Sequence, residues 1–134
     1  MTSIVLNQAW AAGWNRNLSG DGAIAVDGDG VMQISATSGV ALITTPFTAS
    51  AGFLIKARMF GFALSGAVRA FIAYDAAAVS IMTDEVIADA DLQMREIISA
   101  LAHSYADTTL YLGVGVRAGE TGSGKFFAPR LNID

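Results

Sequence analysis

The chain has 134 residues, no cysteine and a formal net charge of −4. This length corresponds to one domain spanning residues 1–134, the lack of cysteine excludes disulfide and thiol chemistry, and the acidic balance argues against nucleic-acid binding. Hydrophobic residues make up 53% of the chain and charged residues 15%, where a soluble monomer carries about 25% charged residues. This composition suits either a membrane protein or a soluble protein that hides much of its surface against partners.

A long uncharged stretch lies between Asp29 and Lys56, but glycine, proline, serine and threonine interrupt it. A membrane-spanning helix needs about 20 mostly apolar residues in a row, so we expect no membrane segment. The opening MTSIVLNQAW lacks the basic region and the apolar run of a secretion signal, so we expect no secretion signal. Burial of surface against partners is the favoured hypothesis.

Turn-forming residues recur along the chain roughly every 8–12 residues, which is typical of a β-sandwich or barrel. Residues 24–26 and 31–36 flank the DGDG sequence, which predicts a hairpin. Residues 40–45 are rich in β-branched side chains. Residues 53–60 alternate, with Ile55 and Met59 on one face and Lys56 and Arg58 on the other.

Two later segments show the same period of two. Val68, Ala70, Ile72 and Tyr74 fall on one face of the first. In the second, residues 110–117, one face carries only leucine and valine, and the other carries Tyr111, Gly113, Gly115 and Arg117. These patterns predict strands with one buried face.

Residues 91–105 fit two structures. The apolar residues Met94, Ile97, Ile98, Leu101 and Tyr105 match an amphipathic helix with Asp91 as its N-cap. The same sequence also fits a strand over residues 96–103. Periodicity alone favours the helix.

The order of these elements resembles a known architecture. The segments VMQIS, VALITTPFTAS, GFLIKARMF, GAVRAFIAYD, MREIISALAHSYADTTLYLGVGV and KFFAPRLNI follow one another as in the antiparallel jelly-roll β-sandwich of carbohydrate-binding modules and galactose-binding-like domains. The resemblance implies an all-β fold and a strand at residues 96–103. It also implies that the last strand pairs beside the first.

The same resemblance bears on metal binding. Many members of these families carry aspartates after the aromatic residue of the last strand, where they help to bind calcium. Here Ala128 and Pro129 stand at those positions, and Ala9 and Trp10 stand where an acid is expected after the first strand. We therefore expect no bound metal and no cofactor.

The candidate binding residues are aromatic or basic. Trp10 and Trp14 suit a sugar-stacking platform, although core packing is the favoured interpretation for at least one of them. Arg58, Arg69 and Arg117 would line one concave sheet face if their strands are neighbours, unless cross-strand acids pair with them. Two further aromatics suit such a face, Tyr74 and Tyr111.

No catalytic constellation stands out. The acids Asp84, Glu85, Asp89, Asp91 and Glu96 are interpreted as a solvated surface, and the only histidine, His103, as structural. The sequence GETGSGK resembles a phosphate-binding loop but lacks the serine or threonine after its lysine. We therefore expect a protein that is not an enzyme.

Two functions fit. The first is a structural protein of a phage or phage-like particle, such as a capsid decoration (cement), spike or fibre component. It would form a homo-oligomer, possibly a trimer, dock on a capsid or other virion protein, and reside in the virion. The alternative is a carbohydrate-binding module that recognises a glycan through a concave sheet face or loop aromatics. A host glycan bound by a virion protein would combine the two.

Overall fold

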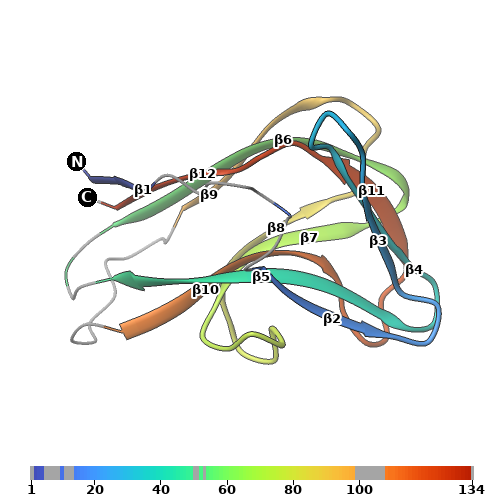
Figure 1. Cartoon of the computed structure of the whole chain (residues 1–134), viewed down its shortest axis with the longest axis horizontal. Coiled ribbons are helices and arrows are strands. Elements are labelled where there is room, and N and C mark those ends of the chain that lie inside the picture. Colours follow the sequence, from blue (N-terminus) through green and yellow to red (C-terminus); the bar gives the residue numbers. More distant parts are fainter. Residues whose placement is uncertain are drawn as a thin grey trace.

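The computed structural model describes residues 2–4, 10, 14–49, 52, 54–98 and 108–133. Every regular element in this part of the chain is a strand, and the strands form two antiparallel sheets packed face to face (Figure 1). The predicted all-β, jelly-roll sandwich is confirmed. The seven-stranded sheet contains β1 (Thr2–Ile4), β3 (Ala23–Val26), β4 (Met32–Ala36), β6 (Ile55–Gly66), β9 (Gln93–Ile98), β11 (Gly122–Phe126) and β12 (Arg130–Ile133). The five-stranded sheet contains β2 (Asn15–Ser19), β5 (Val40–Ala49), β7 (Val68–Ala73), β8 (Ile81–Ile87) and β10 (Thr108–Val116).

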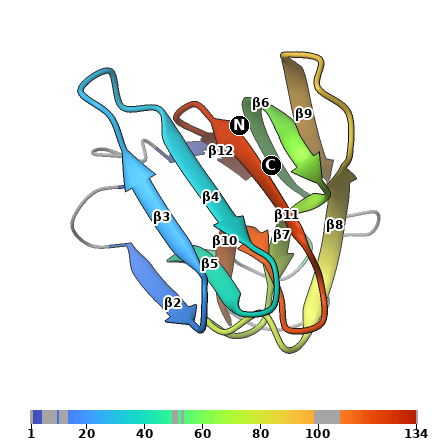
Figure 2. The ribbon, with the colours of Figure 1, turned by 90° about the vertical axis from the view of Figure 1, so that its right-hand side faces the viewer.

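The order of strands places the longest ones in the middle of each sheet. In the five-stranded sheet the order is β2-β5-β10-β7-β8. In the seven-stranded sheet, β6 pairs with β9 along one edge and with both β11 and β12 along the other. Figure 2 shows that β2 and β3 form one side of the sandwich and β8 and β9 the other. Within the described residues, no helix is long and apolar enough to cross a bilayer.

Alternation along the strands builds the core between the sheets. On β6, Ile55, Ala57 and Met59 are buried, and on β10 every leucine and valine is buried. These side chains join Phe126 and Ile34 in one apolar cluster. Burial of apolar area at about 25 cal/mol per Å² is the main force that holds two such sheets together.

The two ends of the described chain meet in the seven-stranded sheet. β1 pairs antiparallel with β12, with Thr2 opposite Ile133 and Ile4 opposite Leu131. Figure 1 shows the two termini side by side at one end of the sandwich. The predicted pairing of the last strand with the first is confirmed.

The DGDG sequence forms the predicted hairpin between β3 and β4. The Asp27 carboxylate accepts hydrogen bonds from the backbone N–H groups of Asp29 and Val31, at 2.8 and 3.1 Å. The Gly30 N–H donates to the Asp27 carbonyl. One aspartate thus satisfies the backbone donors of the turn, as aspartate commonly does.

The ambiguous segment is a strand where it is described. β9 covers residues 93–98 and pairs with β6, so the helix favoured by periodicity is wrong there. Ile97 faces the core, while Met94 and Ile98 are exposed on the opposite face. The remaining predicted strand residues, 99–103, and His103 lie outside the described residues. Pairing with β6 outweighs the helical spacing of the apolar residues, because the tendency of a segment to form a strand depends on the neighbours it packs against.

Strands β2 and β8 were not predicted, whereas β5 covers most of the segment VALITTPFTAS, which the resemblance gives as one strand. β2 and β8 are edge strands whose residues are largely exposed, so they lack the alternation that marks a half-buried strand. β5 continues through Pro46 to Ala49. Its neighbour β2 pairs only with residues 40–44, so the missing N–H of Pro46 lies beyond the end of that ladder, where proline is tolerated.

Candidate functional site

The outer face of the five-stranded sheet is covered at its centre by residues 74–80, which connect β7 to β8. In Figure 1 this connection lies beneath β5 and β10. The Thr44 hydroxyl of β5 donates a hydrogen bond to the Ala76 carbonyl at 3.3 Å. A second apolar cluster lies where the connection meets the sheet. It is made of Leu42, Phe71, Ala73 and Ala78, the last of which belongs to the connection. The centre of this face is therefore packed and not open to a ligand.

Two glycines of β10 make room for that cluster. A Cβ on Gly113 would stand 2.6 Å from the ring of Phe71, and a Cβ on Gly115 would stand 2.7 Å from the side chain of Leu42. Both distances are too short for carbon atoms. The large side chains therefore lie over β10 only because these two positions have none.

Three predicted site residues lie on or beside this face. Tyr111 points outward from β10 and Arg69 from β7, while Arg117 directly follows β10. Asp84 and Glu120 both form ion pairs with Arg69. The hydrogen bond that Arg69 donates to the Glu120 carboxylate raises the pKa of Arg69 above its ordinary value, with burial opposing this rise and Asp84 adding to it. The donor fork of Arg69 is thus occupied by acids of the same protein.

The predicted tryptophans lie mainly in the core. Trp10 is completely buried among the core residues, and Trp14 is half-buried against it, with the ring centroids 4.9 Å apart. A ring that stacks on a sugar must be accessible, and Trp10 is not. Its position therefore fits the core-packing interpretation. Tyr74 is exposed and follows β7 directly.

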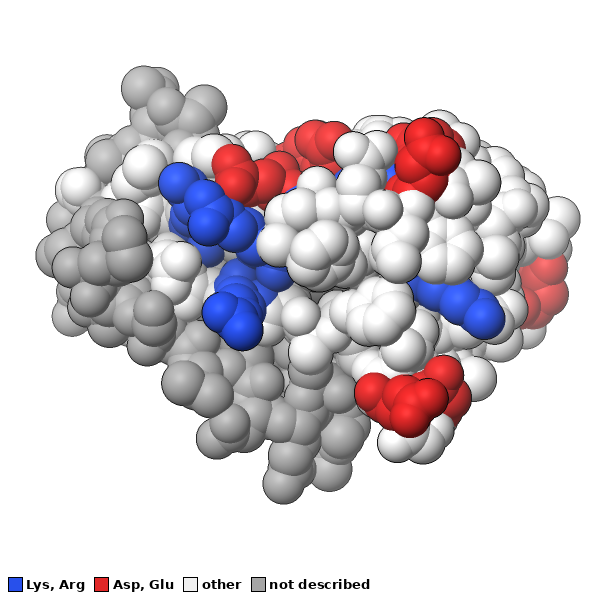
Figure 3. Space-filling view, turned by 90° about the horizontal axis from the view of Figure 1, so that it is seen from above, with Lys and Arg blue, Asp and Glu red and all other residues white. Residues whose placement is uncertain are grey.

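The outer face of the seven-stranded sheet combines cations with exposed apolar groups. The sequence contains eight lysines and arginines, and half of them point outward from this sheet. On β6 they alternate with the core residues and precede Phe60 and Leu64, whose exposed fractions are 47% and 48%. The four cations are Lys56, Arg58, Lys125 and Arg130. Figure 3, which views this side, shows most of the basic side chains gathered in one cluster.

One extra residue in the last strand shapes this face. Phe126 lies opposite Gly61 and Arg130 opposite Arg58, so four steps along β11 and β12 match three steps along β6. This is a β-bulge at residues 127–129. Phe126 points into the core, and in an unbulged strand of this sequence Arg130, four residues later, would point the same way, since the side-chain period is two. The bulge therefore turns Arg130 outward and Leu131 inward.

Pro129 stabilises the bulge. It is buried, while Phe127 and Ala128 are exposed, and it has no N–H to donate to a ladder. The Phe127 N–H instead donates to the Phe60 carbonyl at 2.9 Å. The sequence suggested that Pro129 marks either an edge or a bend. β12 has neighbours on both sides, so the edge interpretation is wrong and the bend is confirmed.

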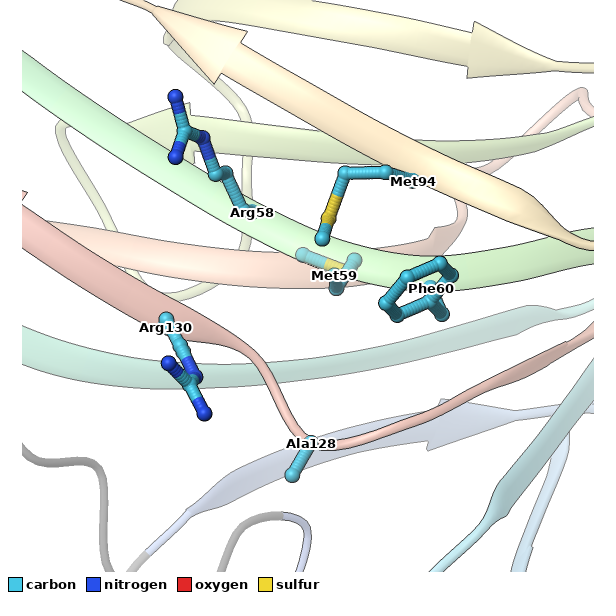
Figure 4. Close-up of a pocket in the computed structure, with 6 residues that line it drawn as sticks. All are labelled: Arg58, Met59, Phe60, Met94, Ala128 and Arg130. Carbon is cyan, nitrogen blue, oxygen red and sulfur yellow. The ribbon is translucent and has the colours of Figure 1, made fainter.

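The bulge opens a hollow of about 440 Å³ beside β6. Figure 4 shows Arg58 and Arg130 at one end, Phe60 at the other, and Met94 of β9 above them. Ala128 and Met59 complete the lining. A volume of this size lies in the range of small-ligand sites, which is about 300–1,000 Å³. The hollow thus offers an accessible aromatic ring next to arginine donors.

The two arginines of the hollow have different partners. Arg58 Nε donates to the Glu96 carboxylate of β9 at 2.7 Å, and both side chains remain well exposed. Arg130 forms no ion pair with any described acid. Arg58 lies on the other sheet from Arg69 and Arg117, so these three predicted residues do not share one face.

Among the predicted surface acids, Asp89 has a structural role. Asp89 forms a bidentate pair with the buried Arg95, at 2.6 and 2.9 Å, and Arg95 also donates to the Gly61 carbonyl. The Arg95 guanidinium holds the pKa of Asp89 far below its ordinary value. This pair fastens the segment before β9 to β6. Nowhere in the described part of the chain do three or more acids or histidines gather into a group that could hold a metal ion.

The predicted site residues do not include Phe60, Met94 or Arg130. Phe60 and Arg58 share one face of the predicted strand 53–60, which is the only signal that the sequence offered. Arg130 was hidden because the register of β12 depends on the bulge. The proline within a predicted strand was the available sign of that irregularity.

Comparisons with known proteins support the fold. No protein-family model matches the sequence, and no curated protein matches it either. Among solved structures, a family 4 carbohydrate-binding module is 15% identical, with a TM-score of 0.69 and coverage of 99% of this chain and 95% of that one. A family 61 module, TmCBM61, solved with β-1,4-galactotriose, is 8% identical, with a TM-score of 0.61 and complete coverage of both chains.

A third similar structure comes from a phage. The enzymatically active domain of tailspike protein 4 of bacteriophage CBA120 is 8% identical, with a TM-score of 0.64, over 92% of this chain and 20% of that one. At these identities the similarity establishes the fold. The structure therefore shares the β-sandwich of carbohydrate-binding modules, as the resemblance in the sequence predicts.

Proposed function

We propose that this protein is a non-catalytic carbohydrate-binding module and that a glycan binds in the hollow beside β6. The observation that carries this proposal is the exposed ring of Phe60, held on a central strand next to Arg58 and Arg130. An aromatic ring packs well against the C–H face of a pyranose. Arginine supplies fixed donors for sugar hydroxyls. The likeness to carbohydrate-binding modules supports the same proposal.

Rigid placement favours this face over the other sheet. Phe60 lies on β6, which pairs along both edges, so little ordering is needed when a ligand binds. On the five-stranded sheet, residues 74–80 and Phe71 occupy the centre of the face. An extended glycan lying there would have to displace this packing.

A glycan array tests the proposal with three proteins. The unchanged protein is expected to bind a defined set of glycans. Phe60→Ala is expected to weaken this binding by at least about tenfold, as truncation of an anchoring aromatic commonly does. Leu64→Ala is the matched control, because Leu64 lies on the same strand and face with equal exposure but outside the hollow. Binding that survives Phe60→Ala unchanged would refute the proposed site.

A role in a phage or phage-like particle is the second candidate. The likeness to a tailspike domain favours it, as do exposed apolar side chains such as Val79, Val86 and Leu92. In this case the protein would be a decoration (cement), spike or fibre component that resides in the virion, docks on a capsid or other virion protein, and forms a homo-oligomer such as a trimer. Size-exclusion chromatography with light scattering is the test. A stable oligomer is expected, and a monomer at high concentration would count against this candidate.

A further inference from the structure

The hollow carries an excess of positive charge. Lys56, Arg58 and Arg130 stand together on this face, and of the side chains that point outward from β6, β9, β11 and β12, Glu96 is the only acid. The chain as a whole has a net charge of −4. A local charge of about +2 therefore contrasts with the sign of the whole molecule, and such a patch attracts anions.

The arrangement of the two arginines is unfavourable without an anion. Arg58 and Arg130 are direct cross-strand partners on the same face. Like charges directly opposite each other destabilise a sheet. Glu96 neutralises Arg58 from the far side of β6, because it is the cross-strand partner of Arg58 on β9. No described acid does the same for Arg130.

Two other arginines of this protein are provided with acids. Arg95 binds Asp89 and the carbonyls of Gly61 and Asp91, and Arg69 pairs with Asp84 and Glu120. Arg130 instead points outward at the mouth of a hollow, with its planar donor fork accessible. That fork matches the two oxygens of a carboxylate.

We infer that the ligand of the hollow is an anionic saccharide whose acidic group binds Arg130 while its ring packs on Phe60. The inference rests on the proposed function, because it specifies the class of glycan for the same site. The acidic group can be a carboxylate, as in a uronic acid, or a sulfate ester. Arg58 also lies beside the ligand, but its charge is shared with Glu96, which holds its side chain in place.

Isothermal titration with three galactose-based probes distinguishes these ligands. The probes are neutral β-1,4-galactotriose, a trigalacturonate that carries carboxylates, and a κ-carrageenan oligosaccharide that carries sulfates. The protein is expected to bind at least one anionic probe at least about tenfold more tightly than the neutral one. Raising the salt concentration is expected to reduce this preference. The probe preferred identifies the acidic group.

Two variants locate the effect. Arg130→Gln is expected to remove the preference for the anionic probe, because it weakens binding of that probe much more than binding of the neutral one. Lys125→Gln is the matched control, because it removes the same charge from the same sheet face outside the hollow. Melting temperatures of both variants verify that they are folded.

The outcomes separate the inference from the proposed function. Equal binding of neutral and anionic probes, lost with Phe60→Ala, would overturn the inference and leave the proposed function intact. An anionic preference that persists in Arg130→Gln would also overturn the inference. Equally tight binding of a polyglutamate peptide would overturn it in favour of an acidic protein partner. If none of the probes binds and the glycan array is also blank, both proposals fail.

Discussion

Arg58 and Arg130 lie directly opposite each other on β6 and β12, on the outer face of the seven-stranded sheet. Residues 127–129 hold one residue more than the facing part of β6, and the bulge absorbs it so that this pairing is kept. The same register places Leu131 and Ile133 in the core. A single irregularity thus shapes the candidate site and completes the core.

Deletion of Ala128 should remove the bulge but keep the register of β12. Three steps from Phe126 to Arg130 would then match three steps along β6, so Arg130 still points outward and Leu131 inward. Deletion of both Phe127 and Ala128 leaves two steps against three, and such a slip reverses the side chains of β12. We expect the double deletion to lose more than about 3 kcal/mol of unfolding free energy and the single deletion clearly less, measured by urea denaturation. Equal stability of the two variants would show that the number of residues at 127–129 does not fix the register.

The adjacent residues Phe126 and Phe127 should contribute very differently to the stability of the protein. Phe126 is fully buried and packs over Gly61, whereas 39% of Phe127 is exposed. We expect Phe126→Ala to cost about 3–5 kcal/mol of stability and Phe127→Ala less than about 1 kcal/mol. Thermal and urea unfolding of the two variants check this. Similar losses would contradict their placement on opposite sides of the sheet.

Gly113 should not tolerate a side chain. Its Cβ would stand 2.6 Å from the Phe71 ring and 2.7 Å from the Ile43 carbonyl oxygen. Gly113→Ala is expected to destabilise the protein by about 1–3 kcal/mol, as overpacking commonly does. Gly28→Ala is the control, because no atom lies within 4 Å of the added group. A neutral Gly113→Ala would mean that the Phe71 ring does not pack over Gly113.

The Asp89–Arg95 pair should make stability depend on pH. Because the pKa of Asp89 is lowered in the folded protein from its ordinary value of 3.8, its contribution is present above that value and is lost as the pH falls through the lower, folded value. We expect Asp89→Asn to lower the melting temperature at pH 7, and the gap from the unchanged protein to narrow as the pH falls below about 4.

A charge-matched variant controls this experiment. Asp29→Asn removes one acid from the exposed turn after β3, where the Asp27 carboxylate holds the backbone. Its melting temperature should follow that of the unchanged protein at every pH. The difference in melting temperature between Asp89→Asn and the unchanged protein should not stay constant from pH 7 to pH 2. A constant difference would exclude the ion pair as its cause.

The sequence predicts the fold well wherever one face of a strand is buried. Alternation along residues 55–60 and 110–116 identifies β6 and β10, because their core residues recur with a period of two. The exposed edge strands β2 and β8 carry no such pattern and were missed. For β9, local periodicity favours a helix, and only pairing with β6 determines the strand.

The candidate site was harder to predict, because it depends on register. Arg58 was selected, but its neighbours in space are Arg130 and Met94, which come from two other strands. The outward direction of Arg130 follows from the bulge. The sequence alone does not show which residues of two neighbouring strands lie opposite each other. Trp10, the most conspicuous aromatic, is buried, while the accessible ring of Phe60 belongs to an ordinary alternating strand.

A glycan that binds on the outer face of the seven-stranded sheet should change the surroundings of the residues that line the hollow. Titration of the 15N-labelled protein with a glycan that it binds, followed by amide chemical shifts, measures this. We expect the largest shift changes at Phe60, Met94, Ala128 and Arg130, with little change at Thr109 and Tyr111 of β10. If the largest changes fall on β5 and β10, the glycan binds on the opposite sheet and the proposed site is wrong.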